Sequence, residues 1–222
     1  MSDVVKREYR SDLRTAHALE TKRRIVAAAA DLFVSKGYGH TSIDAVAAAA
    51  GVSRKTVFTA VGGKAELLTL ALNWAIAGDD APVTIAERPE MIALLQLDDP
   101  GRLLDGWARL LAGIDARVGD LFTALEVAAS LDATARSLFE RLQAQRRGGA
   151  QVVVEAVAAL GCLRDGWSRP ELIDLAYLLT EPLLHRRLVG TRGWSGTRFE
   201  RWLADTLRQQ LLKSAPPGPG SR

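Results

Sequence analysis

The chain has 222 residues, of which 48% are hydrophobic and 6% aromatic, and its formal net charge is +3. With a mean hydropathy of +0.02, and with a longest apolar run (152–162) too short for a bilayer, this composition excludes a membrane-spanning chain. The single cysteine, Cys162, excludes an internal disulfide and fits a reducing compartment. No secretory signal pattern is visible at the N-terminus, so we expect a cytoplasmic protein.

The charge is divided unevenly along the chain. Residues 1–64 carry a net charge of +5, whereas residues 65–222 carry −2. A basic N-terminal third joined to a nearly neutral remainder is typical of a protein whose N-terminal part binds nucleic acid.

In chain order, residues 1–17 mix charges of both signs without an apolar stripe and predict a flexible arm. A first helix is expected over residues 20–36, with Gly37 after it as a stop signal. The next helix begins after Thr41 or Ser42, which are good N-cap residues.

Residues 41–61, TSIDAVAAAAGVSRKTVFTAV, have the pattern of a helix-turn-helix. Gly51 can take the positive φ that a sharp turn needs, and Ser53 can cap the second helix. The apolar residues of the first helix recur at helical spacing. The second helix keeps basic and hydroxyl side chains outside, which is the chemistry that contacts phosphates and base edges in a major groove.

The rest of the chain predicts further helices, with starts marked by features such as the early proline of Ser168-Arg169-Pro170. No long stretch alternates with period two, so we expect an all-α protein. Pro182 should kink the helix that contains it, and residues 214–222 form a low-complexity tail expected to be disordered. The expected helices cover 64–78, 90–97, 100–117, 119–131, 133–160 (with an interruption at Gly148-Gly149), 170–189 and 196–213.

Residues 21–72 resemble the TetR family of bacterial transcriptional regulators, through TKRRIVAAAADLFVSKGYGHTSIDAVAAAAGVSRKTVFTAVGGKAELL. The resemblance implies a helix-turn-helix domain over residues 18–63 in an N-terminal three-helix head. It further implies a helical domain over residues 64–213 that dimerises and binds a small-molecule effector. A homodimer would place two heads in successive major grooves of a near-palindromic operator, and a repressor is the usual outcome in the family.

The resemblance also points to the residues that contact DNA. Arg54, Lys55 and Thr56 are expected at base edges, and Ser42, Thr59 and Lys64 at phosphates. The full set carried over is Thr41, Ser42, Ser53, Arg54, Lys55, Thr56, Phe58, Thr59 and Lys64.

Four positions of the second helix depart from the family's usual pattern. Lys55 stands where the family usually has glycine, and Phe58 where it has tyrosine. Ala60 and Val61 replace two further aromatic residues. Because the aromatic contacts to phosphate are weakened, we expect binding to depend more on Arg54, Lys55 and Lys64.

An effector pocket is expected among large apolar residues of the C-terminal helices, although such residues at helical spacing more often form core. Glu126 lies in the apolar run LFTALEVAASL, where a buried carboxylate would need either an arginine partner or a cationic ligand. The candidates are Trp74, Trp107, Leu110, Phe122, Leu125, Glu126, Phe139, Gln143 and Tyr177.

The last two helices are expected to form the dimer interface as a four-helix bundle. Their candidate interface residues are Leu172, Leu175, Leu179, Leu183, Phe199, Trp202, Leu203, Leu207 and Leu211.

Two other function classes compete with this interpretation. An enzyme is disfavoured because His17, His40 and His185 lack metal-ligand spacing and no phosphate-binding glycine loop follows a strand; no cofactor is expected. The alternative that stays open is a ligand-binding or protein-interaction module whose DNA-reading head is weakened at Phe58 and Ala60.

Overall fold

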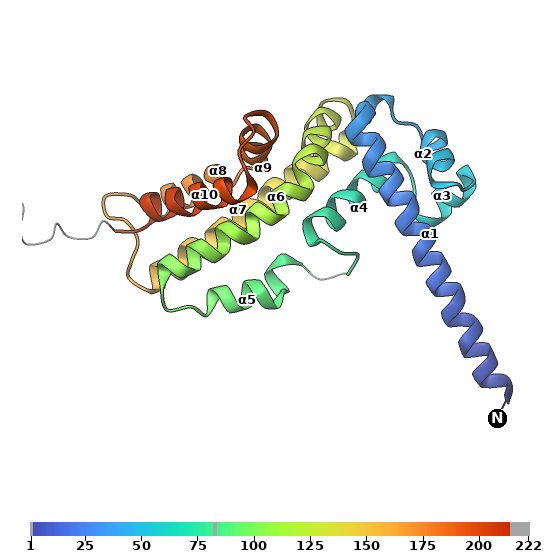
Figure 1. Ribbon diagram of the computed structural model, residues 1–222, viewed down its shortest axis with the longest axis horizontal. Coiled ribbons are helices and arrows are strands. Elements are labelled where there is room, and N and C mark those ends of the chain that lie inside the picture. The colour runs from blue at the N-terminus through green and yellow to red at the C-terminus, as the bar shows by residue number, and fades with distance from the viewer. Residues whose placement is uncertain (1, 82–83, 214–222) are drawn as a thin grey trace, which may run out of the picture. The chain divides into compact units, whose positions relative to one another are not determined.

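The computed structural model describes the backbone of residues 2–81 and 84–213, and side chains from Arg14 onward. Within those ranges the fold is all-α, as predicted, and the one β-type contact is an isolated bridge between Leu163 and Leu212. Figure 1 shows the helices. They are α1 (Ser2–His40), α2 (Ile43–Ala50), α3 (Arg54–Ala60), α4 (Lys64–Ala77), α5 (Pro89–Leu95), α6 (Pro100–Leu131), α7 (Ala133–Ala159), α8 (Arg169–Leu179), α9 (Pro182–His185) and α10 (Gly196–Leu211), with a short 3₁₀ turn η1 (Ile85–Glu87) and a π-helix η2 (Arg186–Thr191).

The chain divides into two compact units. The head unit contains the residues up to Trp74 together with Asp120–Phe139, which is the turn between α6 and α7 and the helix ends on either side of it. The bundle unit contains Ala75–Gly119 and the chain from Glu140 onward. The head unit therefore extends beyond the predicted domain 18–63, since it includes most of α4 and part of α6 and α7.

In the head unit, α1 supplies the buried surface that α2 and α3 cover. Ile25, Ala29 and Phe33 lie about one turn apart on α1 and are buried. Gly37 has a φ of 79° and bends the chain near the end of α1, which brings the Tyr38 ring back onto Phe33 with centroids 5.7 Å apart.

The expected caps of the helix-turn-helix are present. The Ser42 hydroxyl accepts a hydrogen bond from Ala45 N at 3.1 Å, and the Ser53 hydroxyl accepts one from Thr56 N at 3.1 Å. Gly51 ends α2 in the left-handed region with φ 65°. These local signals define where both helices begin and end because they satisfy backbone groups that the helices leave unpaired.

Two glycines allow a matched test of this turn. Gly51→Ala is expected to lower the free energy of unfolding by about 1 kcal/mol, because a Cβ disfavours the left-handed conformation. Gly148→Ala is expected to raise it by about 0.5–1 kcal/mol, because Gly148 lies inside α7 with no atom within 4 Å of an added Cβ. Urea unfolding of both variants checks the opposite signs; a Gly51→Ala protein as stable as the parent would contradict the assigned turn.

The core of the bundle unit lies among α6, α7, α8 and α10. On α10, Phe199, Leu203, Leu207 and Leu211 recur every four residues and all are buried. They belong to one apolar cluster with residues of the other three helices, among them Leu104, Trp107, Ala150, Val153, Val154, Leu172 and Ala176.

Several helix boundaries differ from the predictions. α6 continues through Gly119, and α7 continues through Gly148-Gly149. A glycine inside a helix destabilises it by only about 0.5–1 kcal/mol, and the helical residues on both sides hold the backbone in place. A Cβ on Gly119 would lie 3.5 Å from Arg186 Cβ, which is an ordinary van der Waals distance, so α6 and η2 pack closely here without requiring glycine. Pro182 does more than kink its helix: lacking an N–H, it begins the separate helix α9, which leads into η2.

The N-terminal arm, expected to be flexible over residues 1–17, has a helical backbone from Ser2 as part of α1. Its sequence to Glu20 contains no glycine or proline to interrupt the helix. The tail predicted over residues 214–222 lies outside the described residues. No helix in the described ranges has the length and apolar character needed to cross a membrane.

Candidate nucleic-acid interface

The outward face of α3 presents most of the predicted DNA-contacting side chains. Arg54, Lys55 and Thr59 are exposed, Thr56 is half-buried, and Phe58 keeps 47% of its surface exposed. Val57, between them, is fully buried. Val57 thus anchors α3 in the head, while the opposite side of the helix, with its basic, hydroxyl and aromatic side chains, stays accessible.

Arg54 is held in place by two weak contacts. Its Nη1 donates to Asp44 Oδ2 of α2 at 2.7 Å, and its guanidinium carbon lies 5.6 Å from the centroid of the Phe58 ring. Both partners of the ion pair are more than half exposed, and such a pair contributes little to stability. Arg54 is therefore oriented before binding and can exchange Asp44 for a nucleic-acid acceptor at small cost.

The hydroxyl groups of α3 are also positioned by local bonds. Ser53 Oγ and Thr56 Oγ1 lie 2.8 Å apart, and Thr59 Oγ1 donates to Lys55 O at 2.9 Å. Each hydroxyl oxygen still has acceptor capacity. The α3 face combines a guanidinium, an ammonium group and three hydroxyls within two helical turns.

The two residues predicted at the start of α2 differ in accessibility. Ser42 is exposed, so its hydroxyl can cap α2 and also lie near a phosphate. Thr41 is only 2% exposed, and its hydroxyl lies 2.9 Å from Gly37 O and 3.1 Å from Leu32 O. Its side chain joins α1 to α2, and we therefore leave Thr41 out of the proposed interface.

Lys64 lies in a cluster that ties α4 to the α6–α7 turn inside the head unit. Its Nζ is 4.2 Å from the centroid of the Tyr38 ring and 3.4 Å from Gly39 O. The Tyr38 hydroxyl donates to Asp132 Oδ2 at 3.2 Å. Burial, reinforced by Asp132, raises the pKa of Tyr38 to about 12, and burial lowers the pKa of Lys64. A phosphate contact by Lys64 would compete with these internal contacts.

Tyr38→Phe is expected to lower the free energy of unfolding by about 1 kcal/mol, because it removes the hydrogen bond to Asp132 and keeps the ring. A double-mutant cycle with Asp132→Asn measures the coupling between the two side chains. A coupling energy near zero would contradict the Tyr38–Asp132 contact.

The bundle unit contains a polar cluster around Arg146 of α7. Arg146 Nη1 donates to Glu181 Oε2 at 2.8 Å and to Gln143 Oε1 at 2.5 Å. Its Nη2 donates to Tyr177 O at 3.1 Å and to Thr180 O at 3.0 Å, and its guanidinium lies 4.7 Å from the centroid of the Tyr177 ring.

Asp115 of α6 is a second buried polar residue of the bundle unit and is only 2% exposed. Burial raises its pKa to about 7, with Glu181 contributing in the same direction and Arg146 opposing. Among the described residues, Asp115 Oδ2 and Glu181 Oε1 are buried oxygens without a hydrogen-bond partner. Sequence reasoning missed Asp115, although it continues the apolar i, i+3/i+4 series of α6.

The residues predicted to form one effector pocket are divided between the two units. Glu126, expected to be buried, is exposed on α6, so the buried carboxylate of this helix is Asp115 instead. Gln143 and Tyr177 meet in the Arg146 cluster. Trp107 is buried in the core of the bundle unit, where Leu110 packs against it. The remaining candidates, Trp74, Phe122, Leu125 and Phe139, belong to the head unit.

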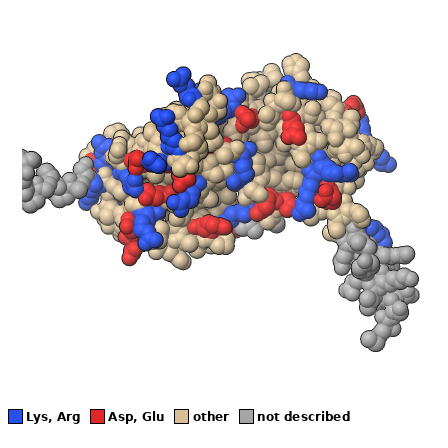
Figure 2. Space-filling view, viewed as in Figure 1, with Lys and Arg blue, Asp and Glu red and all other residues tan. Residues whose placement is uncertain are grey.

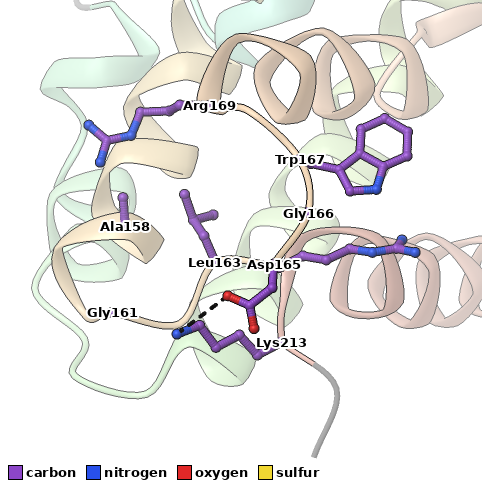
Figure 3. A pocket seen from close by; sticks show the side chains of 9 residues that line it. Ala158, Gly161, Leu163, Asp165, Gly166, Trp167, Arg169 and Lys213 are labelled. Atoms are coloured by element: carbon purple, nitrogen blue, oxygen red, sulfur yellow. Dashed lines mark ion pairs between the residues drawn. The ribbon is translucent and has the colours of Figure 1, made fainter.

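A shallow hollow lies elsewhere in the bundle unit, between the end of α7 and the start of α8 (Figure 3). It encloses about 320 Å³ and is lined by Leu163, Arg164, Asp165, Trp167 and Lys213, among others. Its charged groups already have partners: Lys213 pairs with Asp165 at 3.8 Å, and Arg164 lies 5.7 Å from the Trp167 ring centroid. None of the predicted pocket residues lines this hollow.

Metal chemistry has no support in the described ranges, where no group of three or more His, Cys, Asp or Glu side chains is placed to hold an ion. On the face of the molecule drawn in Figure 2, acidic and basic side chains intermingle.

Residues 25–71, which run from the C-terminal part of α1 to the middle of α4, match the family described as bacterial regulatory proteins, tetR family. The N-terminal domain is a TetR-family domain. Helix α3 is thus the second helix of this domain's helix-turn-helix, and the α3 face described above is its outward side.

Two curated relatives from Pseudomonas putida, both described as HTH-type transcriptional regulators, are similar to part of this chain. The HTH-type transcriptional regulator SrpR is 40% identical over 57 residues, which cover 26% of this chain and 27% of the relative. The uncharacterized HTH-type transcriptional regulator TtgW is also 40% identical over 57 residues, covering 26% of this chain and 42% of the relative. The chain therefore matches less than half the length of either relative.

The similarity to solved structures extends beyond the TetR-family domain and covers most of this chain. NalD, the secondary repressor of the MexAB-OprM multidrug efflux pump in Pseudomonas aeruginosa, is 21% identical with a TM-score of 0.65, over 87% of this chain and 97% of NalD. A putative transcriptional regulator from Saccharomonospora viridis in complex with choline is 20% identical with a TM-score of 0.68, over 88% and 99%. These relatives are described as regulators or repressors and none as an enzyme.

The predicted dimer-interface residues fall into a buried group and a half-buried group. The structure buries five of them inside the single chain, where they belong to the apolar cluster of the bundle unit: Leu172, Phe199, Leu203, Leu207 and Leu211. They are therefore unavailable to a second chain, and we revise the predicted interface. The half-buried members of the prediction are Leu175, Leu179, Leu183 and Trp202.

Proposed function

We propose that the chain is a DNA-binding transcriptional regulator that acts in the cytoplasm as a homodimer, represses its target genes and responds to a small-molecule effector. The observation that carries the proposal is the exposed α3 face, on which Arg54, Lys55, Thr56 and Thr59 stand out from a helix anchored by Val57. Such a face fits the major groove, where guanidinium groups read guanine edges and hydroxyl groups contact phosphates.

The relatives supply the finer parts of the proposal. NalD is a repressor, which favours repression here, and the choline complex of the Saccharomonospora regulator favours a small-molecule effector. Two copies of the head on a two-fold axis would read half-sites about 34–36 Å apart, so the operator is expected to be near-palindromic.

For the dimer, the accessible apolar surface of α8 is the proposed interface. Leu178 is 61% exposed, and Leu175 and Leu179 beside it are half-buried. On α10, Trp202 is half-buried and supports the same assembly. Leu178→Glu is expected to convert the dimer to a monomer in analytical ultracentrifugation.

The proposal is tested by a gel shift with the DNA upstream of the chain's own gene. The parent protein and the control Arg102→Ala, which removes an exposed arginine of α6, are expected to give the same specific shift. Arg54→Ala is expected to lose it. If the parent gives no specific shift even at low salt, the alternative is favoured: a ligand-binding or protein-interaction module with a weakened DNA-reading head.

An effector acts only if it binds the DNA-competent and incompetent states with different affinity. If a compound binds the protein and leaves its affinity for the operator unchanged, that compound is not an effector of DNA binding.

A further inference from the structure

Phe58 exposes a large apolar ring on the outward face of α3. All five phenylalanines of the chain lie in the described ranges, and the other four are buried or half-buried, whereas Phe58 keeps 47% of its surface exposed. The ring is not needed to hold α3 in the head, because the fully buried Val57 does so. A partner that covers the ring would therefore gain the free energy of burying apolar surface without disturbing the fold.

Phe58 shares one side of α3 with Arg54. The two residues are four positions apart, which makes them neighbours on a helix, and the Arg54 guanidinium carbon lies 5.6 Å from the centroid of the Phe58 ring. Lys55 and Thr59 form a second pair at the same spacing, in which Thr59 Oγ1 donates to Lys55 O at 2.9 Å. Arg54 and Phe58 are therefore expected to reach the same part of a bound duplex.

The two side chains differ in what they can recognise in a major groove. A guanidinium group donates two hydrogen bonds to O6 and N7 of guanine. A phenyl ring has neither a donor nor an acceptor, so Phe58 cannot hydrogen-bond a phosphate or a polar base edge. The apolar group that the major groove offers is the C5-methyl of thymine. Because stacked base pairs are about 3.4 Å apart, groups separated by 5.6 Å reach base pairs about one or two steps from each other.

We propose that Phe58 is a specificity-determining residue that selects thymine by packing its ring against the C5-methyl group, close to the guanine that Arg54 contacts. This inference rests on the proposed function, because it specifies a base that the α3 face reads. It also gives a role to the phenylalanine that stands where the family usually has tyrosine. Without a hydroxyl group, the ring contributes to base selection and not to phosphate binding.

The test uses the full chain and the duplex that it selects from a random DNA library. Each thymine is replaced in turn by deoxyuridine, which keeps the hydrogen-bonding groups of thymine and lacks only its methyl group. Fluorescence anisotropy is expected to show that the parent binds about fourfold more weakly after one such replacement in a half-site, the effect of losing one buried methyl group. Replacement of thymines that the ring does not contact should leave the affinity unchanged.

Two variants separate the ring from the rest of the α3 face. Phe58→Ala is expected to bind the thymine duplex more weakly than the parent does, and to bind the thymine and uracil duplexes with equal affinity, because it has no ring to cover the methyl group. The matched control is Lys55→Ala, which removes an exposed side chain of the second pair. It is expected to weaken binding to both duplexes by the same factor and so to keep the thymine preference. Circular dichroism verifies that each variant is folded.

The outcomes distinguish this inference from the proposed function. Three results overturn the inference alone: a selected half-site without thymine, equal binding of every uracil form and the thymine form by the parent, or a thymine preference that Phe58→Ala retains. A parent that selects no sequence overturns the proposed function, and the inference with it.

Discussion

Asp115→Asn is expected to raise the free energy of unfolding at pH 8 by about 2–4 kcal/mol, the order of magnitude implied by a pKa raised from 3.8 to about 7. Most substitutions in a core destabilise, so a gain of this size would be diagnostic. It follows from removing a buried negative charge that Arg146 only partly offsets. Asparagine has nearly the same shape and carries no charge.

The sign of the pH dependence follows from linkage. The native state holds the Asp115 proton more tightly than the unfolded chain, whose carboxyl titrates near its ordinary value of 3.8. The stability of the parent relative to Asp115→Asn is therefore greatest below about pH 4 and falls as the pH rises to about 7. Above pH 7 the difference is constant, because both states are then ionised.

Urea unfolding of the parent and of Asp115→Asn between pH 4 and pH 8 measures this difference directly. Subtracting the two curves cancels the contributions of the remaining groups, including Asp79, whose pKa the Arg88 side chain lowers to about 2. The charged groups that act on Asp115, Arg146 and Glu181, are present in both proteins. A variant that is less stable than the parent at pH 8, with no pH-dependent difference, would contradict the burial of an unpaired carboxyl.

The second large effect is expected at the DNA interface. Arg54→Ala should weaken specific binding by at least about tenfold, since a good base contact contributes about 1–3 kcal/mol and a dimer uses two copies. The Asp44 partner does not compensate, because the Arg54–Asp44 pair is exposed and weak.

Lys55→Ala should act differently from Arg54→Ala. Each lysine at a phosphate changes the slope of log affinity against log salt by about 1, so the dimer should lose about 2 units of slope. Fluorescence anisotropy on operator and unrelated DNA between 50 and 300 mM salt separates the two effects. If Lys55→Ala leaves both affinity and slope unchanged, Lys55 does not replace the aromatic phosphate contacts weakened at Phe58 and Ala60.

The helix-turn-helix could be predicted from the sequence because its signals are local. Gly51 and Ser53 act on backbone groups within a few residues, and the burial of Val46, Ala47 and Val57 follows from helical periodicity. The structure agrees at each of these positions. Thr41 is the exception, since its burial depends on carbonyls of α1 that only the folded head brings near it.

The bundle unit was less predictable because several helices compete for the same apolar residues. Leu203 and Leu207 were expected to face a second chain, yet they lie in the core of the bundle unit. Periodicity alone cannot distinguish a core position from an interface position. The same ambiguity explains why Glu126 was expected to be the buried carboxylate of α6, although Asp115 is. Both are acids within apolar stretches of α6, but the direction of each side chain depends on where α7 and α8 pack.

Reading of a specific DNA sequence by the α3 face is the central element of the proposed function. Selection of bound duplexes from a random DNA library by the full chain, with Arg54→Ala in parallel, tests it most directly. We predict that the parent enriches one near-palindromic sequence and that Arg54→Ala loses or alters the enrichment. Enrichment of no sequence by the parent, or of the same sequence with equal strength by both proteins, would contradict it.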